Sequence, residues 1–144
     1  MEEDTSEEEK GLWKISVDGS SCVSGNGAGL VLTSPDGWII EYALRFVFKA
    51  TNNKAEWEAL IVGLAIAKHL EVQKIEASSD SQLVIGLQSG EYEAREDSMA
   101  KYLTHIKSLK SAFQMLRVLK LPRAENGRAN QLSKLATAEE LQRN

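Results

Sequence analysis

The stretch LWKISVDGSSCVSGNGAGLVLTSPDGWIIEYALRFVF, residues 12–48, decides the fold of this chain. Apolar and polar residues alternate over 12–18, which is the period of a β-strand. After a glycine-rich segment, residues 30–33 and 38–48 have the pattern of two more strands, with a Ser-Pro-Asp-Gly turn signal between them. The sequence therefore predicts one strand followed by an antiparallel hairpin over 29–48.

Downstream of the hairpin, the apolar residues change from the period of a strand to that of a helix. A long helix is predicted over residues 51–70, and strands then alternate with helices. In order, these are a strand over 72–78, a short helix over 81–88, a helix over 99–109, a strand over 114–121, a loop over 122–127 and a helix over 129–141. In the last helix, Leu132, Leu135 and Ala136 are expected to face inward. This succession predicts one α/β domain over residues 12–141, a mixed sheet with helices packed on it.

Negative charge is concentrated at the N-terminus. Residues 1–10 hold six acidic residues and one lysine, which contribute −5 to a net charge of −4 and leave +1 on the remainder. We interpret residues 1–11 as an acidic disordered tail or the remnant of a linker in a longer polypeptide. A nearly neutral domain can bind nucleic acid only through a local basic patch. The single cysteine, Cys22, excludes an internal disulfide and a cysteine-based zinc site.

Three acidic residues lie near the ends of predicted elements. Asp18 closes the first strand, so its carboxylate is expected to be exposed at the sheet edge; Glu56 lies near the start of the long helix, and Asp80 lies between a strand and a helix. Each has a structural alternative: a turn aspartate, a capping glutamate and an N-cap aspartate. Together they predict a site for hard cations such as Mg²⁺, because such ions require carboxylate oxygens. Two ions in such a site can promote phosphodiester cleavage.

Five segments carry a resemblance to a known family. They are VDGSS (17–21), GAGLVL (27–32), TNNKAEWEAL (51–60), SDSQLV (79–84) and ENGRANQLSKLA (125–136). In sequence and spacing they resemble the ribonuclease H family, in particular the ribonuclease H domain of gypsy-type (LTR) plant retrotransposon polyproteins, over residues 12–137. The resemblance implies a five-stranded mixed sheet of order 3-2-1-4-5 flanked by helices. It also implies cleavage of the RNA strand of RNA–DNA hybrids with two Mg²⁺ ions, or Mn²⁺ as a substitute.

The resemblance implies catalytic and metal-binding roles for four positions. Asp18, Glu56 and Asp80 match three of the family's four metal-binding carboxylates. The fourth position is Asn130, whose amide oxygen can ligate a metal but brings no charge. Two hypotheses follow: an enzyme attenuated by Asn130, or a catalytically silent nucleic-acid-binding or connection domain of a polyprotein. A DNA-processing relative of the same fold, such as an integrase, is disfavoured because the TNNKAEWEAL amides suit hybrid recognition.

The resemblance also implies contacts with the hybrid. Amide side chains would read its minor groove, a threonine would hold a DNA phosphate, and a Gly-Ser backbone would approach the RNA strand. These positions are Asn52, Asn53 and Gln82 for the amides, Thr51 for the phosphate, and Gly19 and Ser20 for the RNA strand. Arg123 is a further candidate for a phosphate contact, with a solvated loop arginine as the alternative.

Residues 89–97 read SGEYEARED, with four acids and one arginine, so no basic substrate-binding segment is evident there. We therefore expect the isolated domain to bind hybrids weakly, with a covalently linked reverse transcriptase supplying most of the binding. The resemblance implies a cytoplasmic retroelement particle as the location, with the nucleus as the alternative. No membrane partner is expected, because the apolar stretch over 59–67 is far shorter than the roughly 20 residues that cross a bilayer.

Overall fold

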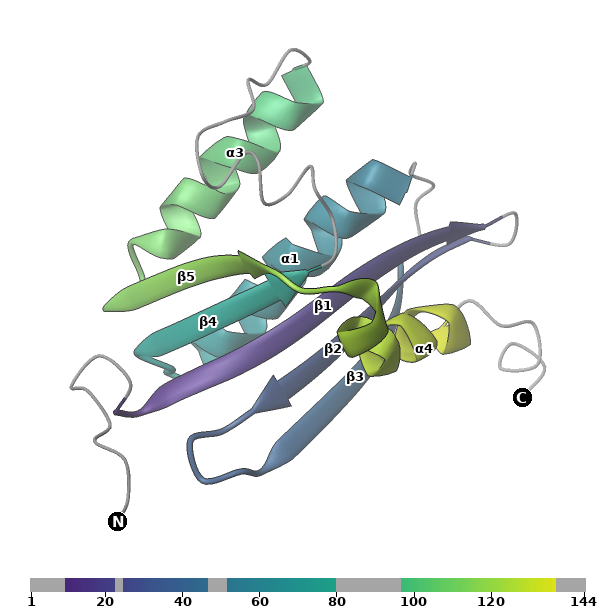
Figure 1. Ribbon diagram of the computed structural model, residues 1–144. Coiled ribbons are helices and arrows are strands. Elements are labelled where there is room, and N and C mark those ends of the chain that lie inside the picture. The colour runs from purple at the N-terminus through teal and green to yellow at the C-terminus, as the bar shows by residue number, and fades with distance from the viewer. Residues whose placement is uncertain (1–9, 23–24, 47–51, 80–96, 137–144) are drawn as a thin grey trace.

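The computed structural model of the chain describes residues 10–22, 25–46, 52–79 and 97–136. The elements within them are β1 (Leu12–Cys22), β2 (Gly25–Thr33), β3 (Ile39–Phe46), α1 (Asn52–His69), β4 (Lys74–Ser79), α3 (Asp97–Lys110), β5 (Met115–Lys120), the 3-10 helix η1 (Arg123–Asn126) and α4 (Gly127–Ala136). This order confirms the predicted succession of strands and helices (Figure 1). The short helix predicted over 81–88 lies outside the described residues.

The strands form one mixed sheet in the order β3-β2-β1-β4-β5, as predicted. β1 pairs with β2 and β2 pairs with β3 in antiparallel register, whereas β4 runs parallel to both β1 and β5. The parallel register places Ser16 of β1 opposite Ser78 of β4. β4 therefore ends beside the part of β1 that leads into Asp18.

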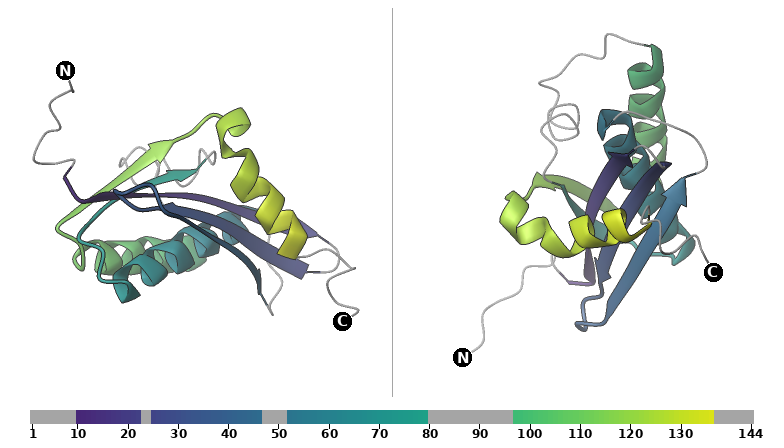
Figure 2. Two further views of the ribbon diagram at one scale, coloured as in Figure 1. Left: turned by 90° about the horizontal axis from the view of Figure 1, so that it is seen from below. Right: turned by 90° about the vertical axis from the view of Figure 1, so that its right-hand side faces the viewer.

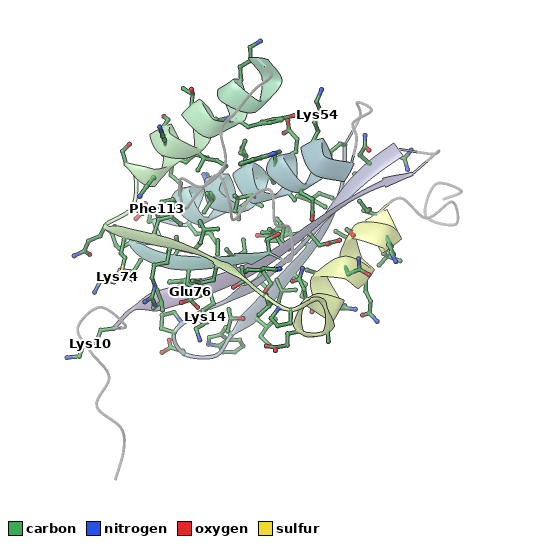
Figure 3. All side chains as sticks on the ribbon, turned by 45° about the horizontal axis from the view of Figure 1, so that its top comes forward. Lys10, Lys14, Lys54, Lys74, Glu76 and Phe113 are labelled. Atoms are coloured by element: carbon green, nitrogen blue, oxygen red, sulfur yellow. The ribbon has the colours of Figure 1, made fainter. Side chains whose placement is uncertain are left out.

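Helices cover both faces of the sheet. α1 and α3 lie on one face and α4 lies on the other (Figure 2). Gly63 of α1 faces Ile15 and Val17 of β1, and an added Cβ would lie only 2.8 Å from Ile15 Cδ1. The side chains between α1, α3 and the sheet make up the main apolar core, including Phe113 just beyond α3 (Figure 3). This core fixes the position of α1, which carries Glu56.

Trp57 joins α1 to α3. Its side chain is 1% exposed, and its ring stacks on that of Tyr102 with centroids 6.0 Å apart and an interplanar angle of 9°. Burial and a hydrogen bond with Glu58 raise the pKa of Tyr102 to about 12. The residue next to Glu56 is therefore committed to packing.

Among the described helices, none is long and apolar enough to cross a membrane.

The predicted strand ends around Asp18 differ most from the structure, and the predicted loop over 122–127 contains the 3-10 helix η1 and the start of α4. β1 continues for four residues beyond Asp18, and β2 begins at Gly25, because the small residues after Asp18 keep pairing with the glycine-rich segment. α4 buries Leu132 and Ala136 as expected, but Leu135 is 48% exposed. Consecutive residues of an α-helix lie about 100° apart around its axis, which turns Leu135 away from the face that Ala129, Leu132 and Ala136 present to the sheet.

Candidate active site

Asp18 lies within β1 and faces α4. Side chains alternate along a strand, so Val17 and Gly19 face α1 while Asp18 points to the opposite side. The Asp18 side chain is 3% exposed, so the expectation of a solvent-exposed carboxylate at a strand end was wrong. The reason is that α4 covers this face of the sheet. A carboxylate in such a position needs hydrogen-bond donors.

Two side chains of α4 donate to the same oxygen of Asp18. The Ser133 hydroxyl lies 2.8 Å from Asp18 Oδ2, and the Asn130 amide nitrogen lies 3.2 Å from it. The amide nitrogen of Asn130 must face the carboxylate, because its oxygen there would bring two acceptors into contact. Two candidate residues, Asp18 and Asn130, which are 112 positions apart in the chain, therefore touch directly.

Glu56 approaches the same point of β1 from the other face. Its Oε1 accepts a hydrogen bond from the backbone N–H of Gly19 at 2.5 Å. A Cβ on Gly19 would lie 2.3 Å from the carbonyl oxygen of Ala55, so only glycine permits this approach of β1 to α1. The Gly19 N–H thereby holds the Glu56 carboxylate against β1, one residue after Asp18. Ser20, the next residue, donates its hydroxyl to the carbonyl of Ser133 at 3.2 Å.

A second glycine brings α4 onto the sheet. Gly29 is paired with Asp18 in the β1–β2 register. A Cβ at Gly29 would lie 1.9 Å from the Ala129 carbonyl oxygen and 2.6 Å from the Ser133 backbone nitrogen. The α4 backbone therefore rests directly on Gly29, and this close contact allows Asn130 and Ser133 to reach Asp18.

Two polar contacts, one from the end of η1 and one from the first turn of α4, hold α4 in place. The buried Asn126 donates from Nδ2 to the carbonyl of Val17 at 3.0 Å, one residue before Asp18. Arg128 forms a bidentate ion pair with Glu41 of β3, with both nitrogen–oxygen distances at 2.8 Å. The hydrogen bonds from Arg128 lower the pKa of Glu41. These contacts fix α4 against β1 and β3, and hence fix the helix that carries Asn130.

Several predicted site residues are not placed by the structure. Thr51, Asp80 and Gln82 lie outside the described residues, as do the side chains of Asn52, Asn53 and Arg123. Asp80 follows directly on the end of β4, and its role remains a prediction. The described residues bring together Asp18, Gly19, Glu56 and Asn130, with Ser20 next to them.

Ser133, Gly29 and Asn126 take part in this site, although the sequence led us to expect no site role for Ser133 or Asn126 and only a strand-packing role for Gly29. Ser133 follows Asn130 by three residues, which on a helix places both on one face. That spacing could have identified Ser133 from the sequence as a neighbour of Asn130. The glycines at positions 25, 27 and 29 alternate along a strand, which places them on one face and was a signal for a close approach there.

The donor atoms of this site suit a hard divalent cation. Asp18 and Glu56 supply carboxylate oxygens and Asn130 supplies an amide oxygen, all ligand types that Mg²⁺ and Mn²⁺ accept. Among the residues that the structure describes, no group of three or more His, Cys, Asp or Glu side chains could hold a metal. The described part therefore provides two acids and one amide, and a third acid would have to come from Asp80.

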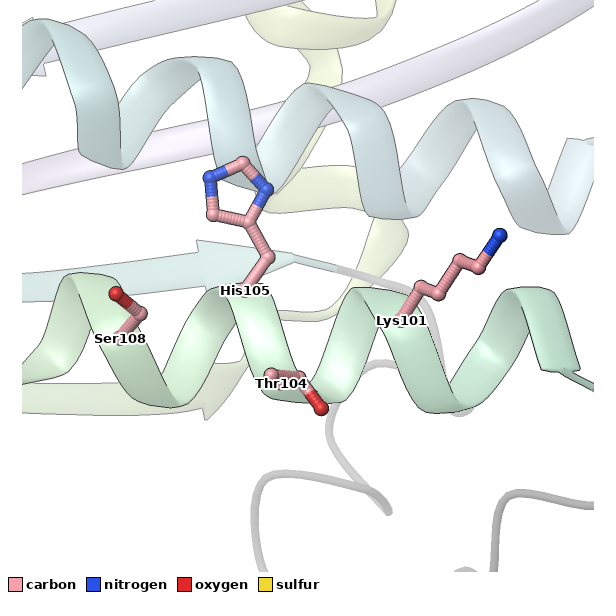
Figure 4. A pocket seen from close by; sticks show the side chains of 4 residues that line it. All are labelled: Lys101, Thr104, His105 and Ser108. Atoms are coloured by element: carbon pink, nitrogen blue, oxygen red, sulfur yellow. The ribbon is translucent and has the colours of Figure 1, made fainter.

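An open pocket lies elsewhere, on α3. It is lined by Lys101, Thr104, His105 and Ser108, at the spacing of one helical face (Figure 4). None of the predicted site residues whose side chains the structure describes lines it. We place the candidate active site at Asp18 because the convergence of acids and donors is there.

A family model described as "Reverse transcriptase-like" matches residues 16–136 of the chain. The chain is 33% identical to the "Ribonuclease HI" of Halobacterium salinarum over 105 residues, which are 73% of this chain and 53% of that protein. It is 30% identical to a "Bifunctional protein" of Mycobacterium tuberculosis over 83% of its own length and 34% of that protein. The chain thus spans about half and about a third of these relatives.

Two solved structures are also similar to this chain. The crystal structure of RNase H1 from Halobacterium salinarum superposes with a TM-score of 0.82 at 32% identity, covering 88% of this chain and 97% of that one. LC11-RNase H1 in complex with an RNA/DNA hybrid superposes with a TM-score of 0.79 at 26% identity, covering 90% and 99% of the two chains. Both likenesses extend over nearly all of the described fold.

Proposed function

Because the chain belongs to the ribonuclease H family, we propose that it hydrolyses the RNA strand of RNA–DNA hybrids in a metal-dependent reaction. The observation that carries this proposal is the convergence at β1 described above. Asp18 contacts Asn130 on one side of the strand, and the backbone of Gly19 contacts Glu56 on the other. The LC11 relative in complex with an RNA/DNA hybrid supports the substrate class.

Asp18, Glu56, Asp80 and Asn130 would hold two Mg²⁺ ions, with Mn²⁺ as a substitute. Ions bound there would supply activation of a water molecule and stabilisation of the leaving oxygen. The protein's own part is to keep its ligand groups in place. The Gly19 N–H holds the Glu56 carboxylate, and the α4 donors hold Asp18. Fixed ligands lose less orientational freedom when an ion binds.

The substrate contacts belong to the same proposal. The backbone at Gly19 and Ser20 lies beside the site and would approach the RNA strand. The other proposed contacts are Thr51, Asn52, Asn53, Gln82 and Arg123. Amides suit this task because they can donate to and accept from base edges and 2′-hydroxyl groups in the minor groove.

Asn130 is proposed to attenuate the enzyme. A carboxylate at this position would add negative charge to a cation site, whereas the amide adds none. The alternative function is a catalytically silent nucleic-acid-binding or connection domain. The feature that favours it is Asn130 itself, whose amide brings no charge to a cation site.

A Glu56→Gln variant should lose cleavage of a labelled hybrid while keeping its fold. The glutamine oxygen can still accept the Gly19 N–H, so only the charge is removed. Loss of a metal-binding carboxylate costs several kcal/mol, which corresponds to roughly a hundredfold or more in rate. The measurement is single-turnover cleavage with enzyme in excess, in Mg²⁺ and in Mn²⁺. Equal cleavage by the native chain and Glu56→Gln would rule this site out.

The reverse-transcriptase-like description of the family supports a retroelement context, with a linked reverse transcriptase as the main source of substrate affinity. The isolated chain should then bind a hybrid weakly even at low salt, because phosphate contacts dominate such affinities and residues 89–97 are acidic. Fluorescence anisotropy over a salt series measures this. Tight low-salt binding with a steep salt dependence would contradict the need for a partner.

A further inference from the structure

Ser133 is the most buried polar residue beside the candidate site. Its relative exposure is 0%, and its hydroxyl lies 2.8 Å from Asp18 Oδ2 and 2.9 Å from the carbonyl oxygen of Asn130. A hydroxyl has one proton, so it can donate to only one of these acceptors at a time. The carboxylate is the stronger acceptor because it is charged. The Ser133 proton therefore belongs to Asp18.

We infer that Ser133 is a positioning residue for metal binding: its hydroxyl fixes the Asp18 carboxylate in the orientation that receives a divalent cation. This inference rests on the proposed function. An ionised carboxylate has two oxygens with about four acceptor sites, so a donor and a cation can share it. Donors in the second layer around a metal ligand orient it in this way, and their loss typically costs about 10- to 100-fold in metal affinity.

The need for Ser133 follows from Asn130. In the structure, Asn130 donates to Asp18 through its nitrogen. If the amide turns its oxygen toward a cation, it withdraws this donor from Asp18. Of the two α4 donors to Oδ2, Ser133 is then the one that still contacts the carboxylate. An amide at position 130 therefore makes the hydroxyl at position 133 more important for the orientation of Asp18.

A serine hydroxyl can also have a plain structural role, in which it donates only to a backbone carbonyl three residues earlier, and the chain contains an example. Ser111 donates to the carbonyl of Ser108 at 2.7 Å, the same three-residue spacing as Ser133 to Asn130. Ser111 is exposed and lies just after α3, on the opposite face of the sheet from α4. Its hydroxyl has the backbone contact of Ser133 without the carboxylate contact, so it separates the two roles.

The test is the dissociation constant of Mn²⁺ measured by isothermal titration calorimetry on the substrate-free chain. We expect Ser133→Ala to weaken Mn²⁺ binding by about tenfold, and Ser111→Ala to leave it unchanged. Ser133→Cys, which keeps a weak donor of similar size, should fall between the native chain and Ser133→Ala. Circular dichroism of each variant checks that the fold is retained.

The outcomes separate this inference from the function on which it rests. Loss of Mn²⁺ binding in Glu56→Gln together with unchanged binding in Ser133→Ala would overturn the role of Ser133 and leave the proposed function standing. Equal weakening in Ser133→Ala and Ser111→Ala would also overturn it, because the effect would then not depend on Asp18. A native chain that binds no Mn²⁺ would overturn both.

Discussion

An Asn130→Asp variant should bind Mg²⁺ more tightly and cut hybrids faster than the native chain. A unit charge about 4 Å from another contributes about 1 kcal/mol in water and about 4 kcal/mol at an effective dielectric constant of 20. Because 1.4 kcal/mol is a factor of ten, this range corresponds to a gain in affinity of about five- to several-hundredfold. Calorimetric Mg²⁺ titration and single-turnover cleavage measure the two effects.

The same variant should be less stable without metal. Asn130 donates to Asp18 at 3.2 Å, and an aspartate there would replace this donor with a second negative charge. The melting temperature of Asn130→Asp should therefore fall below that of the native chain in EDTA and recover in Mg²⁺. Gln131→Glu, which adds the same charge at the exposed neighbouring position, is the control. If both variants respond alike, general helix charge is responsible and the role of Asn130 is wrong.

Gly29→Ala should have the largest effect on stability. The new Cβ would lie 1.9 Å from the Ala129 carbonyl oxygen, and a backbone atom of a packed helix cannot rotate away. Overpacking of this kind costs about 1–3 kcal/mol and occasionally more, and we expect the upper end of that range here. The displaced α4 would carry Asn130 and Ser133 away from Asp18, so cleavage should fall as well. Urea denaturation gives the change in the free energy of unfolding.

Gly127→Ala is the matched control for this prediction. Gly127 has φ −62 and ψ −39, and an added Cβ would meet nothing within 4 Å. Alanine at such a helical position usually stabilises a protein by about 0.4–1 kcal/mol. A Gly29→Ala variant as stable as Gly127→Ala would show that α4 does not rest on β2 as described.

The strand pattern and the family resemblance together predicted most of the fold. Alternation over 12–18 and the turn signal at 34–37 are local properties, so the first three strands could be placed from sequence. The burial of Asp18 could not, because it depends on which face of the sheet a helix more than a hundred residues later covers. The alternation along a strand indicates on which face of the sheet a residue lies, but it does not indicate which element packs on that face.

The site shows the same division. Residue type and motif predict candidate roles for Glu56 and Asn130, and the spacing of Ser133 places it on the same helical face as Asn130. The burial of Ser133 against Asp18 could not be predicted, because a serine in an amphipathic helix is usually solvated. Gly29 is a second example, because its close contact with α4 depends on where α4 crosses β2. That crossing point is set by tertiary packing rather than by local sequence.

We propose that the site around Asp18, Glu56 and Asn130 cuts RNA paired with DNA. The most direct measurement is the fate of each strand of a hybrid whose RNA and DNA carry different fluorophores, incubated with the native chain in Mn²⁺. We expect that only the RNA strand shortens, that single-stranded RNA and duplex DNA stay intact, and that Asn130→Asp accelerates the same cut. Cleavage of the DNA strand, or no cleavage by either chain at any metal concentration, would contradict it.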